Sequence, residues 1–277
     1  MTTVRDRNGR GRVMETIRLV GPPVLVFFLV IGLWYVASYW ILDPTRRWLL
    51  PPPHMVVYEG FLIPGTLEQI LHGLWQSTKV AFLGLALAFL VGFSMALAMS
   101  QAKWVERSLY PWAVASQTVP ILALVPMIGF WFGFGTMARV IVCFIISLFP
   151  IVINSLTGLL SAEPGLHDLF SLHSGNRRVR LTKLQIPAAL PGIFTGLRTS
   201  AGLSVIGAIV GDFFFGRGVP GLGLLLERYA SRLQSAELMA TVFVACVLGL
   251  AVFWGFGLLG RRMVGHWDPS WSSEGVG

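Results

Sequence analysis

Long apolar runs separated by short polar stretches dominate this chain. A helix of about 20 apolar residues crosses the hydrocarbon layer of a membrane. Runs of this length cover residues 21–41, 77–99, 110–132, 137–160, 192–215 and 236–260. The pattern predicts an all-α, polytopic membrane protein with about six transmembrane helices. Residues 21–262 form the membrane domain, between a polar tail (1–20) and a second tail (263–277).

The first run competes with a cleavable signal peptide, whose apolar core spans about 7–15 residues and ends at small residues. Residues 21–41 are longer and carry Trp34, Tyr35, Tyr39 and Trp40. Aromatic side chains of this kind gather at membrane–water interfaces. We therefore expect an uncleaved first span, preceded by a disordered tail with five arginines.

Small and helix-breaking residues indicate how the spans pack. Two runs carry small residues at every fourth position: Gly84, Ala88, Gly92 and Ala96 in one, and Gly192/Gly196 and Gly207/Gly211 in the other. Such stripes let helix backbones approach closely in lipid. Prolines at positions 111, 120 and 126 interrupt the third run, and the longest loop covers residues 42–76.

Composition and charge agree with a membrane protein. The chain is 55% hydrophobic and 12% charged, with a mean hydropathy of +0.71, whereas soluble domains carry about 25% charged residues. A net charge of +8 raises the possibility of nucleic-acid binding. However, 13 of the 21 Lys and Arg residues lie in the N-terminal tail, in the loops of the same side and at the end of the last span, and five lie in the opposite loops. This bias predicts cytoplasmic N- and C-termini, anionic lipid beside the basic loops and no nucleic-acid partner.

Several kinds of chemistry are excluded by the sequence. A P-loop requires a Gly-Lys pair, but the three lysines follow Thr78, Ala102 and Thr182. The segment G-R-G-V-P-G (216–221) has the residue pattern of a dinucleotide-binding loop. However, it follows an apolar span rather than a strand, so we do not expect it to bind a dinucleotide. Two cysteines and five histidines show no ligand spacing, so we predict no metal site and no catalytic residues.

Polar residues inside the spans are candidates for a solute pathway. Asp212 is an acid within a span, where an ionised carboxylate is costly. It is either an interfacial acid or a pathway or gate residue. Arg198 lies 14 residues away on the same helix, about 21 Å, which is too far for an ion pair. Ser116, Gln117 and Asn154 are the other candidates, although polar residues also join helices in membranes.

A basic segment interrupts the apolar pattern between the fourth and fifth spans. In D-L-F-S-L-H-S-G-N-R-R-V-R-L-T-K-L-Q-I-P, residues 168–173 predict a short helix that stops at Gly175. Residues 177–184 predict a second helix, which is amphipathic. Pro187 and Pro191 would then restart the chain. The loop 161–187 is either an amphipathic element on anionic lipid or a docking element for a cytoplasmic partner.

The pattern D-L-F-S-L-H-S-G-N-R-R…K-L-Q-I-P-A-A-L-P resembles the cytoplasmic signature loop of ABC-importer permeases, which reads E-A-A, three residues, Gly, then a basic run closed by Leu/Ile-Pro. The similarity extends from Leu74 to Arg262. It is greatest to the branch that imports nitrate, sulfonates, taurine and thiamine or riboflavin precursors. Asp168 stands at the motif's Glu, Phe170 at its second Ala and Ser174 at its Gly, with Gly175 displaced by one. Arg177 opens the basic run and Pro187 closes it.

The resemblance implies a permease of the bacterial inner membrane that carries no cofactor of its own. Residues 164–176 would dock on a cytoplasmic ABC ATPase dimer, which would bind ATP and Mg²⁺. An extracytoplasmic substrate-binding protein would deliver the solute, and a second copy of the chain would complete the pathway. The alternatives are a secondary transporter, which needs inverted repeats, and a membrane enzyme, which needs clustered acids or histidines.

Overall fold

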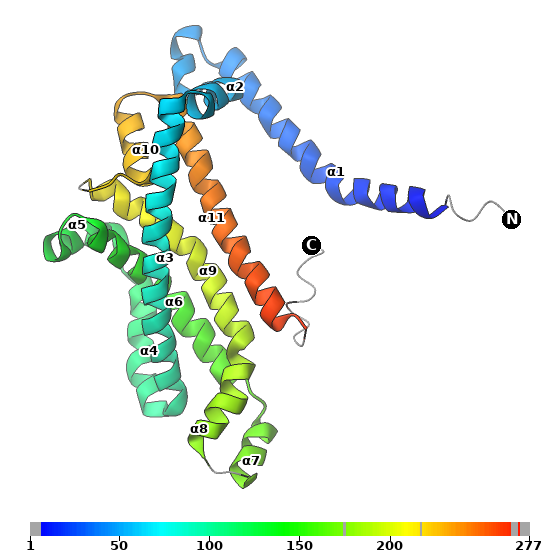
Figure 1. The fold of residues 1–277 in the computed structure, drawn as a ribbon, viewed down its shortest axis with the longest axis vertical. Helices are drawn as coiled ribbons and strands as arrows, with labels where there is room; N and C mark the ends of the chain where they lie inside the picture. The colour runs from blue at the N-terminus through cyan, green and yellow to red at the C-terminus, as the bar shows by residue number, and fades with distance from the viewer. Residues whose placement is uncertain (1–6, 174–175, 217, 267–270, 272–277) are drawn as a thin grey trace. The chain divides into compact units, whose positions relative to one another are not determined.

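The structure, a computed structural model, describes residues 7–173, 176–216, 218–266 and 271. These residues form helices joined by short loops, with no strand among them (Figure 1). The expected all-α fold is confirmed. The chain divides into two compact units: one holds residues up to Leu67 together with Tyr229–Ala240, and the other holds Glu68–Arg228 together with residues from Thr241 onward.

The first unit begins with α1 (Arg7–Val36), which continues as a π-helical turn (Ala37–Ile41). A 3₁₀ helix (Pro44–Leu49), α2 (Pro53–Val57), a second π-helical turn (Tyr58–Leu62) and the start of α3 (Pro64–Gln101) follow. Trp34 Nε1 donates to the Pro51 carbonyl at 3.1 Å, and Ser38 Oγ to that of Leu50 at 2.9 Å. These bonds fold the segment before α2 back onto the end of the first span.

Two expectations for this region are corrected. The tail 1–20 is helical from Arg7, because the helix of the first span propagates back through residues that include arginines, which are good helix formers. The predicted loop 42–76 ends early, since α3 begins at Pro64. Proline suits the start of a helix because its missing N–H would have no partner there.

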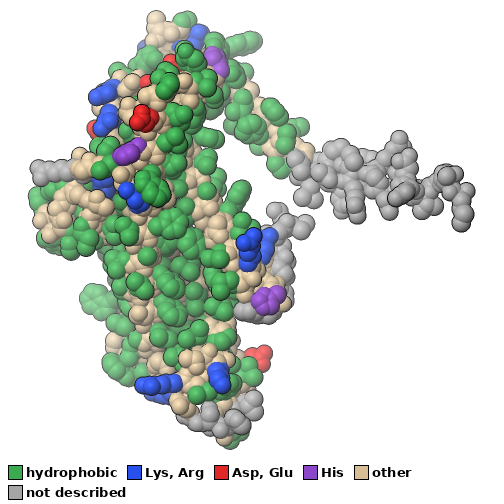
Figure 2. All heavy atoms as spheres, in the orientation of Figure 1, with side chains coloured by type: hydrophobic (Ala, Val, Ile, Leu, Met, Phe, Trp, Pro, Cys, Tyr) green, Lys and Arg blue, Asp and Glu red, His purple; other side chains and the backbone are tan. Residues whose placement is uncertain are grey.

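The second unit contains the remaining helices, except for residues 229–240 at the end of α10 and the start of α11. They are α4 (Lys103–Thr118), α5 (Ile121–Phe132), α6 (Thr136–Leu160), α7 (Pro164–His173), α8 (Arg177–Arg180), α9 (Ile186–Phe214), α10 (Leu222–Ser231) and α11 (Ser235–Val264). Among the described residues, five helices are long and apolar enough to cross a membrane, and α4 with α5 can supply a sixth span. Hydrophobic side chains cover the middle of this unit, and basic side chains gather at the end that holds α8 (Figure 2).

Small residues set the packing of α6 between α3 and α9. Gly84 of α3 lies directly against Cys143 of α6. On the other side, a Cβ added at Gly207 of α9 would lie 2.9 Å from the Cys143 Cα. Ser147 and Ser200 each donate a hydroxyl hydrogen bond to the other's carbonyl, at 3.2 and 2.7 Å. The glycine stripes therefore bring the three backbones together, as the sequence predicted.

The third span is broken rather than continuous. α4 and α5 meet at an angle of 102°. The bend lies at Val119–Pro120, where Val119 is extended (ψ 125°) because the ring of a following proline disfavours the helical conformation. Pro111 and Pro126 lie inside α4 and α5. The span predicted at 110–132 is thus two helices, the first of which starts at Lys103.

The restart expected at Pro187 and Pro191 is wrong. The chain is helical from Arg177 to Phe214 without a break. A π-helical turn at Leu181–Gln185 precedes Pro187, and the Ile186 N–H donates to the Leu181 carbonyl five residues back. The wider turn shifts the hydrogen-bond register just before the proline, whose ring clashes in a regular α-helix. The basic segment is therefore the beginning of the fifth span's helix.

Candidate functional site

The segment 161–187 forms α7, α8 and the π-helical turn at one end of the second unit (Figure 1). Asp168 is exposed on α7 and Phe170 is half-buried. Arg177 and Pro187 are exposed. Ser174 and Gly175 lie outside the described residues. α7 is therefore a ten-residue helix, joined through α8 to the long helix of the fifth span.

Three hydrogen bonds position this segment. Asn176 Oδ1 accepts from the Arg178 N–H at 2.9 Å and caps α8. Arg177 Nη2 donates to the Gln101 carbonyl at 3.4 Å, at the C-terminal end of α3, where a cation also interacts favourably with the helix dipole. Gln101 Nε2 donates to Gln185 Oε1 at 3.3 Å. The start of the Arg177–Phe214 helix is thus tied to the end of the second span.

A groove of about 360 Å³ lies beside the bend between α4 and α5. Ser116 and Gln117 of α4 supply its polar side chains. The other lining residues are apolar: Val119, Ile121, Ile145, Ile146, Phe149, Pro150, Leu203 and Ile206. The structure therefore brings two of the four candidate pathway residues to one apolar groove, whose far wall is built by α6 and α9.

The two polar residues of the groove differ in their bonding. Ser116 donates its hydroxyl to the Ala113 carbonyl at 2.7 Å, so its oxygen can still accept a hydrogen bond from a solute. The Gln117 side chain is exposed and carries both donors and an acceptor. Together they can orient a polar group while the apolar wall contacts the remainder of a small solute.

Asn154 lies outside this groove, at the seam between α6 and α9. Its Nδ2 donates to the Pro150 carbonyl at 2.8 Å. A Cβ added at Gly192 would lie 2.5 Å from the Asn154 carbonyl oxygen, and one at Gly196 would lie 3.1 Å from the Asn154 Cβ. The position of Asn154 is therefore that of a packing residue at a close helix contact.

Asp212 forms a buried ion pair with Arg139, at 2.6 Å between Oδ1 and Nη1. Each side chain is only 2% exposed. Arg139 Nη1 also donates to the Val219 carbonyl at 2.9 Å, and Nη2 donates to the Phe215 carbonyl at 2.6 Å. The pairing satisfies two charges that would each be costly alone in an apolar interior.

This ion pair holds the turn that joins α9 to α10. Asp212 Oδ2 accepts from the Leu224 N–H at 3.0 Å, and Ser77 Oγ of α3 accepts from the Leu222 N–H at 2.9 Å. The turn includes the described residues of the G-R-G-V-P-G segment, and Gly218 has a positive φ of 97°. Asp212 and Arg139 thus connect α6, α9 and the turn in one polar cluster.

Sequence reasoning missed Arg139 and Ser77. Arg139 lies at the start of the fourth span and Asp212 at the end of the fifth, so antiparallel packing brings them together. A Cβ added at Gly211 would lie 3.2 Å from the Arg139 Cα. The Gly207/Gly211 pair was the available signal, because it marks the face of α9 that contacts α6.

Comparison with known proteins identifies the family. A family model described as "Binding-protein-dependent transport system inner membrane component" matches residues 84–272. The formylaminopyrimidine transport permease protein ThiX of Halalkalibacterium halodurans is 32% identical over 231 residues, 83% of this chain and 90% of the relative.

Two further relatives carry other names. The riboflavin transport system permease protein RibX of Chloroflexus aurantiacus is 30% identical over 224 residues, 79% of this chain and 82% of the relative. The taurine transport system permease protein TauC of Escherichia coli is 25% identical over 234 residues, 83% of each chain.

Members of this family are multi-pass permease components of the plasma membrane that are not themselves enzymes and work with ATPase and substrate-binding partners. The helices and the matched region agree with that description across most of the chain. The chain belongs to the family of binding-protein-dependent transport system inner membrane components and is the permease subunit of an ABC transporter.

Proposed function

We propose that this permease imports a small organic solute or anion and that a vitamin precursor is the best candidate. Two relatives that are at least 30% identical are named for formylaminopyrimidine and riboflavin transport. The groove beside the α4–α5 bend supports this choice, because two polar side chains on an apolar wall suit a small heterocycle with a few polar groups. Ser116 and Gln117 would contact the solute, and Asn154 and Asp212 would hold the helices that bound its pathway.

The energy for import would come from a separate chain. The sequence has no Gly-Lys pair for a P-loop, so a cytoplasmic ATPase dimer would bind ATP and Mg²⁺. An extracytoplasmic binding protein would deliver the solute, and two copies of the permease would enclose the pathway. Both termini would be cytoplasmic, which agrees with the excess of basic residues in the loops of that side.

Coupling would occur through the segment 161–187. The position of α7 carries this proposal. It is an exposed ten-residue helix between the fourth and fifth spans. The chain continues from it into the unbroken helix Arg177–Phe214. That helix has 38 residues and is about 57 Å long. Because Leu203 and Ile206 of the same helix line the groove, a displacement of α7 and α8 by the ATPase would reach the solute pathway directly.

Copurification and uptake test the proposal together. The full chain is purified from gently solubilised native membranes, and the accompanying proteins are identified by mass spectrometry. We expect an ATPase and a binding protein. Asp168→Lys should reduce ATPase recovery and solute uptake at least about tenfold, because a reversed charge on a docking helix removes attraction and adds repulsion.

Glu163→Lys is the matched control, since Glu163 is an exposed acid that directly precedes α7. It should leave ATPase recovery near the wild-type level. Equal recovery of the ATPase with the Asp168→Lys variant would exclude docking through α7. Recovery of the wild-type chain without any ATPase would exclude the proposed coupling altogether.

A further inference from the structure

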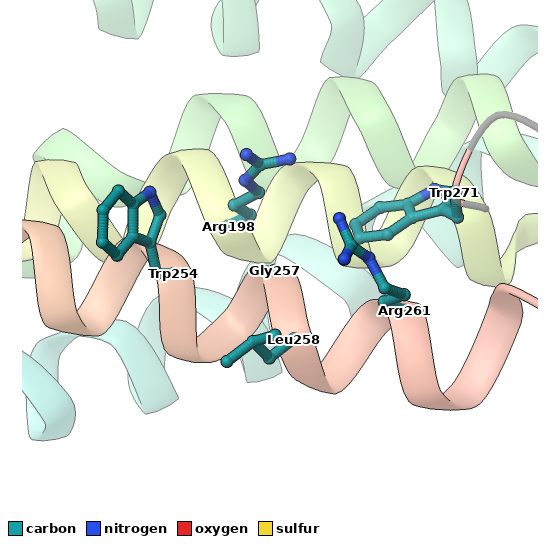
Figure 3. Close-up of a pocket in the computed structure, with 6 residues that line it drawn as sticks. All are labelled: Arg198, Trp254, Gly257, Leu258, Arg261 and Trp271. Carbon is teal, nitrogen blue, oxygen red and sulfur yellow. The ribbon is translucent and has the colours of Figure 1, made fainter. Parts of the chain in front are cut away.

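A second site lies at the end of α11 that carries Arg261, away from the α4–α5 groove. A pocket of about 210 Å³ is lined by Arg198 of α9, by Trp254, Gly257, Leu258 and Arg261 of α11, and by Trp271. Figure 3 shows Arg198 projecting between the two tryptophans, with Arg261 beside Trp271. None of the described residues that line the pocket is acidic.

The pocket is built around the two guanidinium groups. Arg198 lies with its guanidinium carbon 4.4 Å from the centre of the Phe253 ring, a stacked cation–π arrangement that fixes the side chain. Gly257 makes room for it, since a Cβ at this position would lie 3.3 Å from Arg198 Nε. Arginine stays charged at any physiological pH and presents paired N–H donors that match a phosphate.

Trp271 closes one side of the pocket and is firmly held. Its side chain is 6% exposed, and its ring packs edge-to-face on Phe194 at 6.5 Å. A Cβ at Gly260 would lie 2.5 Å from the Trp271 ring, so glycine is required for this contact. Val264 completes the cluster. The wall is therefore a structural part of the second unit.

The pocket lies near the C-terminal end of the last span. Arg261 is in the last turn of α11, and Gly257 is four residues, about 6 Å, nearer the middle of the span. Trp254 and Leu258 are 62% and 59% exposed. An exposed tryptophan beside basic residues near the end of a span is typical of the headgroup region.

A separate apolar groove lies along the same two helices, α9 and α11. It has a volume of about 750 Å³ and is lined by residues of α9, α10 and α11, including Gly202, Gly249 and Phe253. Leu203 and Ile206 of α9 line both this groove and the groove beside the α4–α5 bend. Phe253 belongs to this groove and also supports the Arg198 guanidinium. Arg198, which Phe253 supports, and Arg261 thus lie near an apolar groove whose volume is sufficient for part of an acyl chain.

We propose that this composite surface binds an anionic phospholipid. Arg198 and Arg261 hold the phosphate, Trp254 and Trp271 contact the glycerol region, and an acyl chain lies in the groove between α9 and α11. Basic pockets between transmembrane helices recognise lipid headgroups in this way. The inference requires neither the ATPase nor the imported solute, so it stands or falls separately from the proposed function.

Native mass spectrometry of the detergent-purified full chain tests this site. Phosphatidylglycerol, phosphatidylcholine and inorganic phosphate are added in turn, and retained adducts are counted. We expect the wild type to retain phosphatidylglycerol in preference to phosphatidylcholine. Arg261→Gln and Arg198→Lys should each lower that retention at least about fivefold, because a bidentate phosphate contact is lost.

Arg262→Gln is the matched control: it removes the same charge from the neighbouring position, which does not line the pocket. It should keep the wild-type preference. Arg198→Lys retains the positive charge and guards against a variant that fails to fold. Equal retention of the two lipids, or an equal loss in the Arg262→Gln variant, would overturn the site. Displacement of the lipid by millimolar inorganic phosphate would assign the pocket to small anions instead.

Discussion

The buried ion pair between Arg139 and Asp212 makes a sharp prediction about stability. Asp212→Asn removes the negative charge but keeps an acceptor for the Leu224 N–H. Arg139→Met removes the positive charge together with the hydrogen bonds to the Phe215 and Val219 carbonyls. The double variant Arg139→Met/Asp212→Asn contains neither charge. The three variants therefore separate the cost of a lone buried charge from the loss of ordinary hydrogen bonds.

The expected magnitudes follow from burial. Both side chains are 2% exposed, and breaking a buried pair by removing one partner costs about 3–5 kcal/mol. The cost of Asp212→Asn should lie near the lower end of this range, because Arg139 keeps its two carbonyl acceptors. Arg139→Met should cost near the upper end of this range, since it removes the cation together with its hydrogen bonds to the Val219 and Phe215 carbonyls. The double variant should be more stable than Arg139→Met alone, with a coupling of about 2 kcal/mol or more.

Reversible unfolding in mixed detergent micelles, followed by circular dichroism, measures these free energies. Ser116→Ala is a suitable reference, since Ser116 lies in the groove and makes no contact with the ion pair. Simple addition of the two single effects in the double variant would refute the electrostatic account. So would a loss below about 1 kcal/mol for Asp212→Asn, because a satisfied buried pair cannot be broken at so small a cost.

Two further predictions concern packing and pH. Gly207→Ala should lower the free energy of unfolding by about 1–3 kcal/mol in the same assay, because its Cβ would press on the backbone of α6; Gly202→Ala on the same helix should be tolerated, since its nearest neighbour is 3.9 Å away. Burial, and then the nearby Glu237, raise the pKa of Glu59. The folded state therefore holds the Glu59 proton more tightly than the unfolded state, and stability falls as pH rises through the raised pKa. In a series of melting curves at different pH, Glu59→Gln should reduce the loss of stability as pH rises. The control Glu68→Gln, which changes an exposed acid, should leave that loss unchanged. A wild-type pH profile for Glu59→Gln would contradict the raised pKa of Glu59.

The spans were predictable because length and hydropathy decide them. A run such as 137–160 must be helical in lipid, where every backbone N–H and C=O needs an internal partner, and α6 (Thr136–Leu160) agrees with it within one residue. Prolines were harder to judge. Pro120 ends a helix, whereas Pro187 is accommodated by a π-helical turn. The difference depends on the preceding backbone, which the residue type alone does not determine.

The candidate site was predictable in its residue types but not in its pairings. Ser116 and Gln117 stand out as polar residues in an apolar run, and the structure places them in one groove. Asp212 stood out for the same reason, but its partner Arg139 is 73 positions away in the chain. Only the antiparallel contact of α6 and α9 brings the two together. Such a pairing depends on which faces of two helices meet. The hydrophobic pattern of each helix indicates its own buried face but not which face of another helix packs against it.

The packing of α6 and α9 bears on how the permease would move. Glycines hold these two helices at backbone contact from Gly192 to Gly211, and the Arg139–Asp212 pair joins them at one end. Two helices packed this closely cannot slide or separate without large cost, so we expect them to move as one body. The opposite wall of the groove is the α4–α5 bend, where Pro120 interrupts the helical hydrogen bonds. A displacement that enters through the start of the Arg177–Phe214 helix would therefore change the groove chiefly at this bend, where Ser116 and Gln117 lie.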